Sequence, residues 1–536
     1  MAYSAQPQVN SHKTDFIPFV RTDTDALNTS YLNVRNQTTN LIIQDSGEKR
    51  FLVPRPNITS GGLTPFPEAS QRVQSRVLTV NTVTNGFLFY TINVGGLGTT
   101  YNIYVYNGFL NTHTLLSSAG TASVDFAEFT FISGQRGVFI TGLTGGNSAF
   151  YNISTGTFTG GIAPGLSLRS PVVIDNYVFA YRNGTNDINQ CNFDNPLVWT
   201  AGDFITADLN SGIITRMKKI KNYLAVFKTE GVEFLYNAGN PSGSVLAQYD
   251  SFHSVLNLNA RSNVTGELDV IEYQDSLIVA SQGGPKNKAG LYRITTSSLD
   301  LMPNSSPNNN PYFLLNSANL SIFSIYGNPY ISVVGGSFQE LYYDITNQSL
   351  TNFTFGNSPG LINSIKTEFM FPFFSAFPFI ILANGTTTNW TTFEPNLGSR
   401  SFQDQFLVSG VSYFNCSITL GPIDHGTYFK KRCNKITLEV ETAPTTTSSR
   451  PIITLSKRFS GDSNWRTATN ITQTFRTPVL LGTSTNENLS RNFFILSRIG
   501  SYKTAYFTIT LDPNTEFCLS NYKLFGLSFD LDIGTF

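Results

Sequence analysis

The amino-acid sequence predicts an all-β protein in which a β-propeller of six or seven blades is followed by a C-terminal β-sandwich. Helical periodicity is nearly absent, and the apolar stretches are short, rich in β-branched and aromatic residues, and interrupted by Gly, Asn and Pro. Charged residues make up only 13% of the 536 residues, against about a quarter in ordinary soluble domains. Compact apolar runs also recur every 40 to 50 residues or so, roughly the spacing of propeller blades.

The recurring unit is a polar or Gly-containing turn followed by a compact apolar run. Such runs begin at Phe87, Val138, Tyr177, Tyr223, Leu277, Tyr330 and Phe379. Propeller blades pack face to face around a channel, so both faces of each sheet are largely buried and little charge is tolerated. A large β-sandwich or a β-helix would use the same residue types, but the recurrence favours the propeller.

The pattern changes near Arg400, where longer alternating strands begin. In the stretch from Tyr428 to Thr442, the side chains of Ile436, Leu438 and Val440 are expected on one face of a strand. The segment before the first run is polar, rich in Thr and Asn, and has few strand patterns. We therefore predict an N-terminal arm or docking segment at 1–60, the propeller at 61–400 and the sandwich at 401–536.

Composition bounds the class of protein. Hydrophobic residues at 40% and aromatic residues at 13% exclude disorder. The formal net charge is zero, so charge repulsion cannot keep copies apart, and we expect the chain to be held in an assembly. A monomeric secreted β-protein is the alternative, but the N-terminus shows no signal-peptide pattern.

The most apolar segment runs from Phe369 to Ala383 and contains Pro372 and Pro378. It is short for a membrane span, and we predict a buried strand pair there. The cysteines show no C-x-x-C spacing, which favours buried free thiols in a protein made in a reducing cytoplasm, with a Cys416–Cys433 bridge as the alternative. They are Cys191, Cys416, Cys433 and Cys518.

Residues suited to catalysis are sparse. The four histidines are not spaced as a metal-binding pair, and each is expected to be a surface or hydrogen-bonded strand residue. They are His12, His113, His253 and His425. No G-x-S-x-G elbow is present, and the Gly-rich stretch from Gly95 to Thr100 lacks the Lys of a phosphate loop, so it predicts a hairpin turn. We expect no catalytic residue, metal or cofactor, and hence no enzyme.

Two basic groups stand out in this weakly charged chain. Solvated turns are the favoured interpretation, and contact with DNA phosphates or with an acidic face of a neighbouring subunit is the functional alternative. Two small patches on a neutral chain predict weak duplex binding without sequence preference. The residues concerned are Arg216, Lys218, Lys219 and Lys221 in the first group, and Lys430, Lys431 and Arg432 in the second.

Two sets of spaced residues resemble a known family. The first is a turn leading into a strand pair, with Asp194, Pro196, Trp199, Phe227, Glu233 and Gly239. The second lies near the C-terminus, with Arg432, Leu438, Val440, Glu441, Asp462, Trp465, Arg498, Gly500, Ser501, Phe507, Ile509, Asp512 and Pro513. In order and spacing they resemble signatures of the packaged-DNA stabilisation proteins, the tail hub or nozzle proteins of short-tailed bacteriophages. Departures are Lys503 for a usual Arg, Ile499 for a usual Leu and Glu441 one place later than the usual acid, and the segment from Ser456 to Trp465 lacks the expected acidic pair.

The resemblance covers most of the chain from about Pro171 onward. It implies a structural virion protein, assembled in the host cytoplasm, that extends and closes the DNA channel of the tail, stabilises packaged DNA and takes part in its ejection. It further implies a ring of identical subunits, expected to number six, below the head-to-tail adaptor and in contact with tail spikes or fibres. The alternative is a carbohydrate-binding or glycoside-hydrolysing propeller on a virion or cell surface, which would place a pair of carboxylates across a bond.

Overall fold

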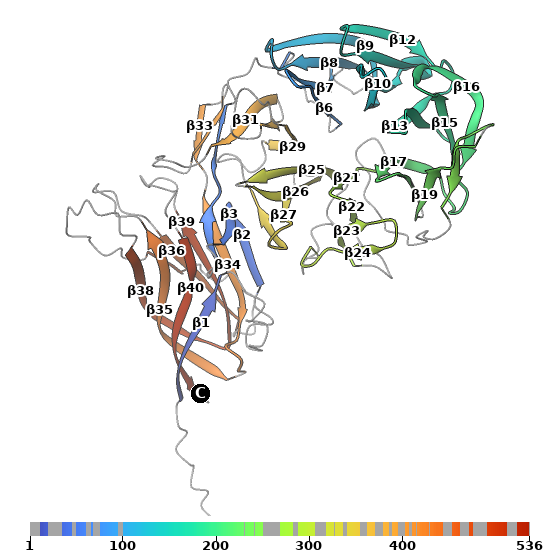
Figure 1. Cartoon of the computed structure of the whole chain (residues 1–536). Helices are drawn as coiled ribbons and strands as arrows, with labels where there is room; N and C mark the ends of the chain where they lie inside the picture. Colours follow the sequence, from blue (N-terminus) through green and yellow to red (C-terminus); the bar gives the residue numbers. More distant parts are fainter. Residues whose placement is uncertain are drawn as a thin grey trace, which may run out of the picture. The chain divides into compact units, whose positions relative to one another are not determined.

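The computed structural model of the chain consists of two compact units (Figure 1). The terminal unit comprises Met1–Thr59, Thr351–Pro359 and Glu394–Phe536, and the central unit comprises Ser60–Leu350 and Gly360–Phe393. The residues that the structure describes are 11–19, 35–45, 50–60, 66–67, 76–94, 100–229, 231–240, 242–249, 268–281, 288–305, 318–325, 327–335, 340–353, 362–369, 379–384, 388–394, 403–406, 410–413, 415–427, 429–442, 453–460, 471–474, 490–511 and 523–534.

The described part of the central unit is built from antiparallel strands and one short 3-10 turn at Thr144–Gly146. The strands in its first half are β6 (Leu78–Asn81), β7 (Gly86–Asn93), β8 (Tyr101–Asn107), β9 (Thr112–Thr130), β10 (Arg136–Leu143), β11 (Ser148–Asn152), β12 (Thr157–Ile162), β13 (Leu168–Ile174), β14 (Tyr177–Arg182), β15 (Asp187–Asn192), β16 (Asn195–Thr206), β17 (Ile214–Ile220), β18 (Tyr223–Lys228), β19 (Gly231–Asn237) and β20 (Leu246–Gln248).

The second half continues in the same way. Its strands are β21 (Ile271–Tyr273), β22 (Ser276–Ser281), β23 (Gly290–Ile294), β24 (Leu299–Leu301), β25 (Ala318–Ile325), β26 (Asn328–Gly335), β27 (Glu340–Asp344), β29 (Ile362–Phe369), β30 (Phe379–Asn384) and β31 (Thr388–Glu394). Three of the four boundaries between the units fall inside strands, namely β5 (Asn57–Ser60), β28 (Ser349–Asn352) and the end of β31, and the fourth lies between Pro359 and Gly360.

The apolar runs identified in the sequence are inner strands of these sheets. They form β7, β10, β14, β18, β22, β26 and β30, and each of these strands has a hydrogen-bonded neighbour on both sides. Strands β13–β16, β17–β20 and β21–β24 each form a four-stranded sheet, whereas β6–β12 form one seven-stranded sheet. Within that sheet, the first part of β9 pairs with β8 and the last part with β10.

Successive sheets of the central unit pack face to face. In β14, Val178 and Ala180 join a core with β9–β11, whereas Phe179 and Tyr181 join a core with β17–β19. Strands β18 and β22 divide their side chains between two cores in the same way. Both faces of these strands are therefore buried, as in a propeller-like fold, and this explains why their sequences are continuous apolar runs with little charge.

The terminal unit contains two large sheets that share one core, and a separate two-stranded sheet formed by β32 and β33. Its strands are β1 (Ser11–Pro18), β2 (Arg35–Thr39), β3 (Leu41–Asp45), β4 (Arg50–Pro54), β32 (Gln403–Phe406), β33 (Gly410–Tyr413), β34 (Cys416–Ile423), β35 (Lys430–Thr442), β36 (Ile453–Ser460), β37 (Ile471–Thr474), β38 (Ser490–Tyr502), β39 (Thr504–Leu511) and β40 (Lys523–Gly534). One sheet has the order β3-β4-β40-β35-β38 with β1 also on β40, and the other includes β2-β34-β39-β36-β37. As expected, Ile436, Leu438 and Val440 all point into the shared core.

The N-terminal segment differs from the predicted arm. Strand β1 pairs with β40 over its whole length, from Ser11 opposite Ile533 to Pro18 opposite Gly526, and β2 pairs with β34. Residues 1–59 thus belong to the same unit as the C-terminal strands. The sequence predicted a separate arm because β1 and β2 are polar and lack the apolar runs by which strands are recognised.

The segment from Phe369 to Ala383 begins in β29 and ends in β30, and these strands pair as predicted. Residues 370–378 and the side chains of both strands lie outside the described part, so their burial stays a prediction. In the described part of the chain, no helix has the length and apolar character needed to cross a membrane.

Candidate functional site

The first basic group lies on strand β17 and continues into the turn after it. Arg216 is buried and its Nη1 lies 2.5 Å from Oδ2 of Asp125 on β9. Lys218 is half-buried, whereas Lys219 and Lys221 are exposed, and Lys221 Nζ lies 3.4 Å from Oδ2 of Asp275. The solvated-turn interpretation is therefore wrong for Arg216, whose buried ion pair removes it from the predicted DNA-contact set.

The ion pair controls the protonation of Asp125. Burial raises the pKa of this carboxyl, but the cations Arg216, Arg76 and Lys218 outweigh the burial and hold the pKa below its ordinary value. The carboxylate therefore stays ionised inside the unit, where it ties β9 to β17. For Lys218, burial is the largest effect and lowers the pKa of its ammonium.

The second basic group lies on strand β35 and alternates between the two faces. Lys430 and Arg432 are exposed, whereas Lys431 is fully buried. The Lys431 ammonium donates to the carbonyl oxygen of Thr427 (2.7 Å) and to that of Lys503 (2.5 Å), and burial lowers its pKa to about 8. Lys431 is thus an internal hydrogen-bond donor and not a DNA contact, so the turn interpretation is wrong here as well. For Lys430 and Arg432, contact with DNA remains a prediction.

Asp194 lies in the turn between β15 and β16, and Pro196 and Trp199 lie in the first residues of β16. Asp194 has a left-handed backbone (φ 54°), and its Oδ1 accepts hydrogen bonds from the Ile132 N–H (2.9 Å) and from Asn176 Nδ2 (3.1 Å). Trp199 donates from Nε1 to the carbonyl oxygen of Pro196 (2.9 Å) and stacks on the ring of Phe139 on β10, with centroids 5.2 Å apart. These residues therefore hold together the turns that follow β9, β13 and β15.

Glu233 is also a structural residue. It is buried on β19, with Oε1 3.5 Å from the ammonium of Lys228 and Oε2 accepting from the Leu209 N–H (2.8 Å). Burial raises the pKa of Glu233, and the neighbouring Lys228 partly opposes that shift. The Lys228 ammonium also donates to the carbonyl oxygens of Ala207 and Asn210.

Four further residues of the two spaced sets are two glycines, Arg498 and Trp465. Gly239 has φ 67°, in the left-handed region that favours glycine, and Gly500 lies in β38 with φ 116°. Arg498 is also in β38, but its side chain lies outside the described part, as does the whole of Trp465.

An exposed apolar surface surrounds the Asp194 turn. Ile132, Phe193, Leu197 and Val198 are all exposed, Ile132 by 67%. Strand β16 is at the end of its sheet, and among the described strands β15 is its only sheet neighbour. Its pairing shifts register between Asn189 opposite Phe204 and Cys191 opposite Trp199, so the intervening residues bulge outward. An edge strand beside apolar side chains is a typical site for contact with another protein.

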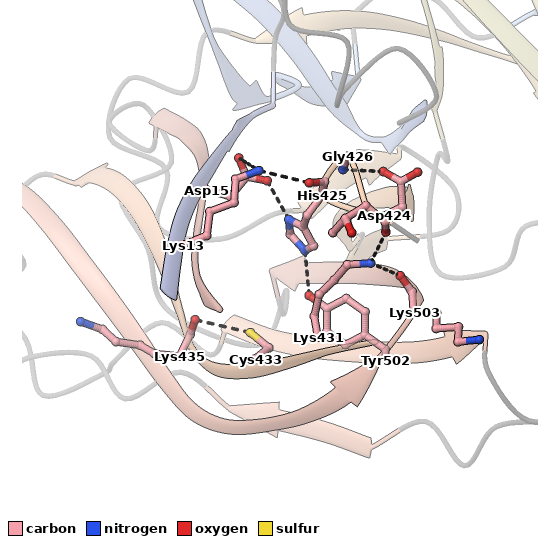
Figure 2. Close-up of polar contacts among 11 residues, drawn as sticks. Lys13, Asp15, Asp424, His425, Gly426, Lys431, Cys433, Lys435, Tyr502 and Lys503 are labelled. Carbon is pink, nitrogen blue, oxygen red and sulfur yellow. Dashed lines mark hydrogen bonds and ion pairs between the residues drawn. The ribbon is translucent and has the colours of Figure 1, made fainter. Parts of the chain in front are cut away.

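His425 was expected to be a surface or hydrogen-bonded strand residue, but it is buried in the turn between β34 and β35 of the terminal unit. His425 Nδ1 lies 2.7 Å from Oδ2 of Asp15 on β1, and Nε2 lies 2.8 Å from the hydroxyl of Tyr502 on β38 (Figure 2). The Lys13 ammonium donates to the His425 carbonyl oxygen (3.1 Å). The partners are 410 and 77 residues away in sequence, so no local motif could have indicated the cluster.

Asp15, His425 and Tyr502 are hydrogen-bonded in a row, as in an acid–base relay. All three side chains are buried, however, and His425 is only 2% exposed. Burial lowers the pKa of His425, against the hydrogen bond and charge of Asp15 that raise it. A neutral imidazole with its proton on Nδ1 donates to Asp15 and accepts from Tyr502, which satisfies all three groups. We interpret the cluster as a tie that fastens β1 to the strands around it.

The remaining candidate groups among the described residues are metal ligands and cysteine thiols. Within them, no group of three or more His, Cys, Asp or Glu side chains could hold a metal ion. Cys191, Cys416 and Cys433 are buried and form no disulfide with one another, as predicted, whereas Cys518 and His253 lie outside the described part.

Comparisons with known proteins give little guidance. No protein-family model and no curated protein matches the chain. Among solved structures, it is similar to one described as "Dihydro-heme d1 dehydrogenase NirN in complex with DHE", with 14% identity and a TM-score of 0.35 over 52% of this chain. The match spans about half of that protein's length (55%), and it is too weak to bear on the function of this chain.

Proposed function

We propose that the protein is a structural component of a short-tailed bacteriophage tail, a hub or nozzle that extends and closes the DNA channel, stabilises packaged DNA and takes part in its ejection. It catalyses no reaction. It forms a ring of identical subunits, expected to number six, in the virion tail below the head-to-tail adaptor, with tail spikes or fibres attached. The sequence signatures described above support the choice of family.

The observation that carries the assembly part of the proposal is the exposed surface around Asp194. Apolar side chains at Ile132, Phe193, Leu197 and Val198 lie beside the edge of β16 that has no sheet neighbour among the described strands. Single exposed apolar residues are ordinary, but several gathered beside a sheet edge mark an interaction site. Because the chain has zero net charge, nothing in its overall electrostatics opposes contact between copies.

The use of charge also supports a structural role. Asp125 and Arg216, Glu233 and Lys228, and the ammonium of Lys431 are buried and bonded inside their units. These groups fix strands to one another. Duplex DNA is therefore expected to pass with weak, sequence-independent contacts, made by exposed residues such as Lys219, Lys221, Lys430 and Arg432.

The test is the oligomeric state of the full chain, alone and mixed with the head-to-tail adaptor of its phage. Light scattering after size exclusion and negative-stain microscopy should show a ring with a central hole. A Leu197→Asp and Val198→Asp double variant should weaken ring formation, whereas Ile495→Asp, at an exposed apolar residue of β38, should not.

Two results would contradict the proposal. One is a protein that stays monomeric at high concentration and with the adaptor present. The other is hydrolysis of host polysaccharide by the purified chain, which would favour the carbohydrate-active alternative. Submicromolar affinity for duplex DNA at physiological salt, measured by fluorescence anisotropy, would overturn the expectation of weak DNA contact.

A further inference from the structure

Two neighbouring hairpin tips of the central unit present apolar side chains to solvent. The turn between β6 and β7 carries Val83, which is 94% exposed, and the turn between β8 and β9 carries Phe109 and Leu110, which are 66% and 61% exposed. The tips adjoin because β7 and β8 are paired, with Phe87 opposite Asn107 at this end.

The two tips are fastened to each other and are therefore preorganised. Asn85 in the first turn donates from Nδ2 to Oδ1 of Asn107 (2.8 Å), and its own Oδ1 accepts from the Phe109 N–H (2.9 Å). Asn107 Oδ1 also accepts from the Leu110 N–H (3.0 Å). A Gly108 N–H to Gly86 carbonyl bond (2.8 Å) closes the pair.

These bonds satisfy main-chain groups that most loop tips leave to water. The first turn adds a bond from the Asn85 N–H to Oγ1 of Thr82 (3.0 Å) and one from the Thr82 N–H to the Asn85 carbonyl (2.7 Å). An N–H group that already has an internal acceptor loses little when water is removed, whereas one without an acceptor is costly to bury. The internal bonds of the Thr82, Asn85, Gly108, Phe109 and Leu110 N–H groups thus lower the cost of removing water from these tips.

The size and charge of the tips indicate the kind of medium. Phe109 offers at most about 150–250 Å², and the Val83 and Leu110 side chains are smaller, so the three together fall short of the ~800 Å² per partner that a stable protein interface buries. Neither turn, TVTN from Thr82 to Asn85 or GFLN from Gly108 to Asn111, contains a charged residue. A fluid bilayer adapts its shape to the protein, so a small apolar contact does not need a complementary partner surface. Apolar side chains bind there by inserting below the lipid headgroups.

We propose that Val83, Phe109 and Leu110 form a lipid-inserting tip that docks the protein on the surface of a neutral bilayer. The contact is peripheral and does not span the membrane. This inference is independent of the tail function proposed above, and it concerns residues other than the β16 surface.

The experiment is flotation of the full-length protein with phosphatidylcholine vesicles. The wild-type chain should float with the vesicles, and the Phe109→Asp and Leu110→Asp double variant should bind at least about tenfold more weakly for each side chain lost. Ile213→Asp makes the same change at an exposed residue elsewhere in the central unit and should bind like wild type. Thermal unfolding checks that each variant is folded.

A second variant keeps the test decisive if the charged variant fails to fold. Phe109→Trp retains an apolar tip, and its fluorescence should shift to the blue with vesicles and be quenched by brominated lipid tails. Failure of the wild-type chain to float, or an unshifted tryptophan, overturns the proposal. Loss of self-association in the folded double variant, without any vesicle binding by wild type, would assign the tips to a protein contact and overturn it as well.

Discussion

Replacing Arg216 with Met tests whether the first basic group is part of the core. The Arg216 and Asp125 side chains are 5% and 8% exposed, with 2.5 Å between Nη1 and Oδ2. Removing the guanidinium leaves the Asp125 carboxylate buried without its nearest cation. Breaking a buried pair in this way costs about 3–5 kcal/mol in the free energy of unfolding.

The expected shift in melting temperature follows from the size of the central unit. With an unfolding entropy of about 2.1 cal/mol/K per residue and about 325 residues, a loss of about 3–5 kcal/mol lowers Tm by about 4–7 °C. The matched control is Lys219→Met, because Lys219 is exposed on the same strand. An exposed substitution changes stability by about 0.5 kcal/mol or less, which corresponds to about 1 °C.

The assay is calorimetric or circular-dichroism melting of the full chain. A double variant, Asp125→Asn with Arg216→Met, should recover part of the loss because no charge is left buried alone. If Arg216→Met melts within about 1 °C of Lys219→Met, the buried pair does not stabilise the unit and the reasoning fails.

The pair also predicts a dependence on acid. The folded pKa of Asp125 lies below its ordinary value, so the unfolded state takes up a proton first as the pH falls. The stabilisation is complete well above the unfolded pKa of about 3.9 and is lost as the pH falls through the folded pKa. Arg216→Met should therefore show a weaker loss of stability on acidification than wild type.

Three further predictions concern the other buried charges. Because His425 stays neutral in the fold, with its pKa below 6.5, the terminal unit should lose stability as the pH falls below about 6.5, and His425→Gln should flatten that profile in melting experiments. Lys431→Met should cost about 1–3 kcal/mol in urea unfolding, since two buried carbonyl oxygens lose their donor, whereas a similar cost for Lys430→Met would contradict the assignment. Glu233→Gln should cost about 3–5 kcal/mol because it leaves the Lys228 ammonium buried without its counter-charge, and a change below about 1 kcal/mol would show that the pair is dispensable.

The inner strands were predictable because their signal is local. Each is a short run of β-branched and aromatic residues between turns, such as the run from Tyr223 that forms β18. Low charge pointed to sheets buried on both faces, and the division of Val178 and Phe179 between two cores shows that arrangement. The alternation of Ile436, Leu438 and Val440 was readable for the same reason.

The pairing of distant segments was not predictable. The sequence of β1 resembles a polar arm. It forms a strand by pairing with β40, which lies more than 500 residues later in the chain. The roles of single charged residues were not predictable either, since the sequence does not distinguish the four cations between Arg216 and Lys221 from one another. Only the partner on another strand, Asp125 for Arg216, decides which side chain is buried.

The sequence by itself determined that the chain forms β-sheets with little charge, and where the inner strands lie, because strand formation and burial depend on neighbouring residues a few positions apart. The tertiary structure decided which strands become partners, which cations are internal, and which apolar residues stay at the surface. Those outcomes depend on contacts between segments hundreds of residues apart, which local sequence patterns do not predict.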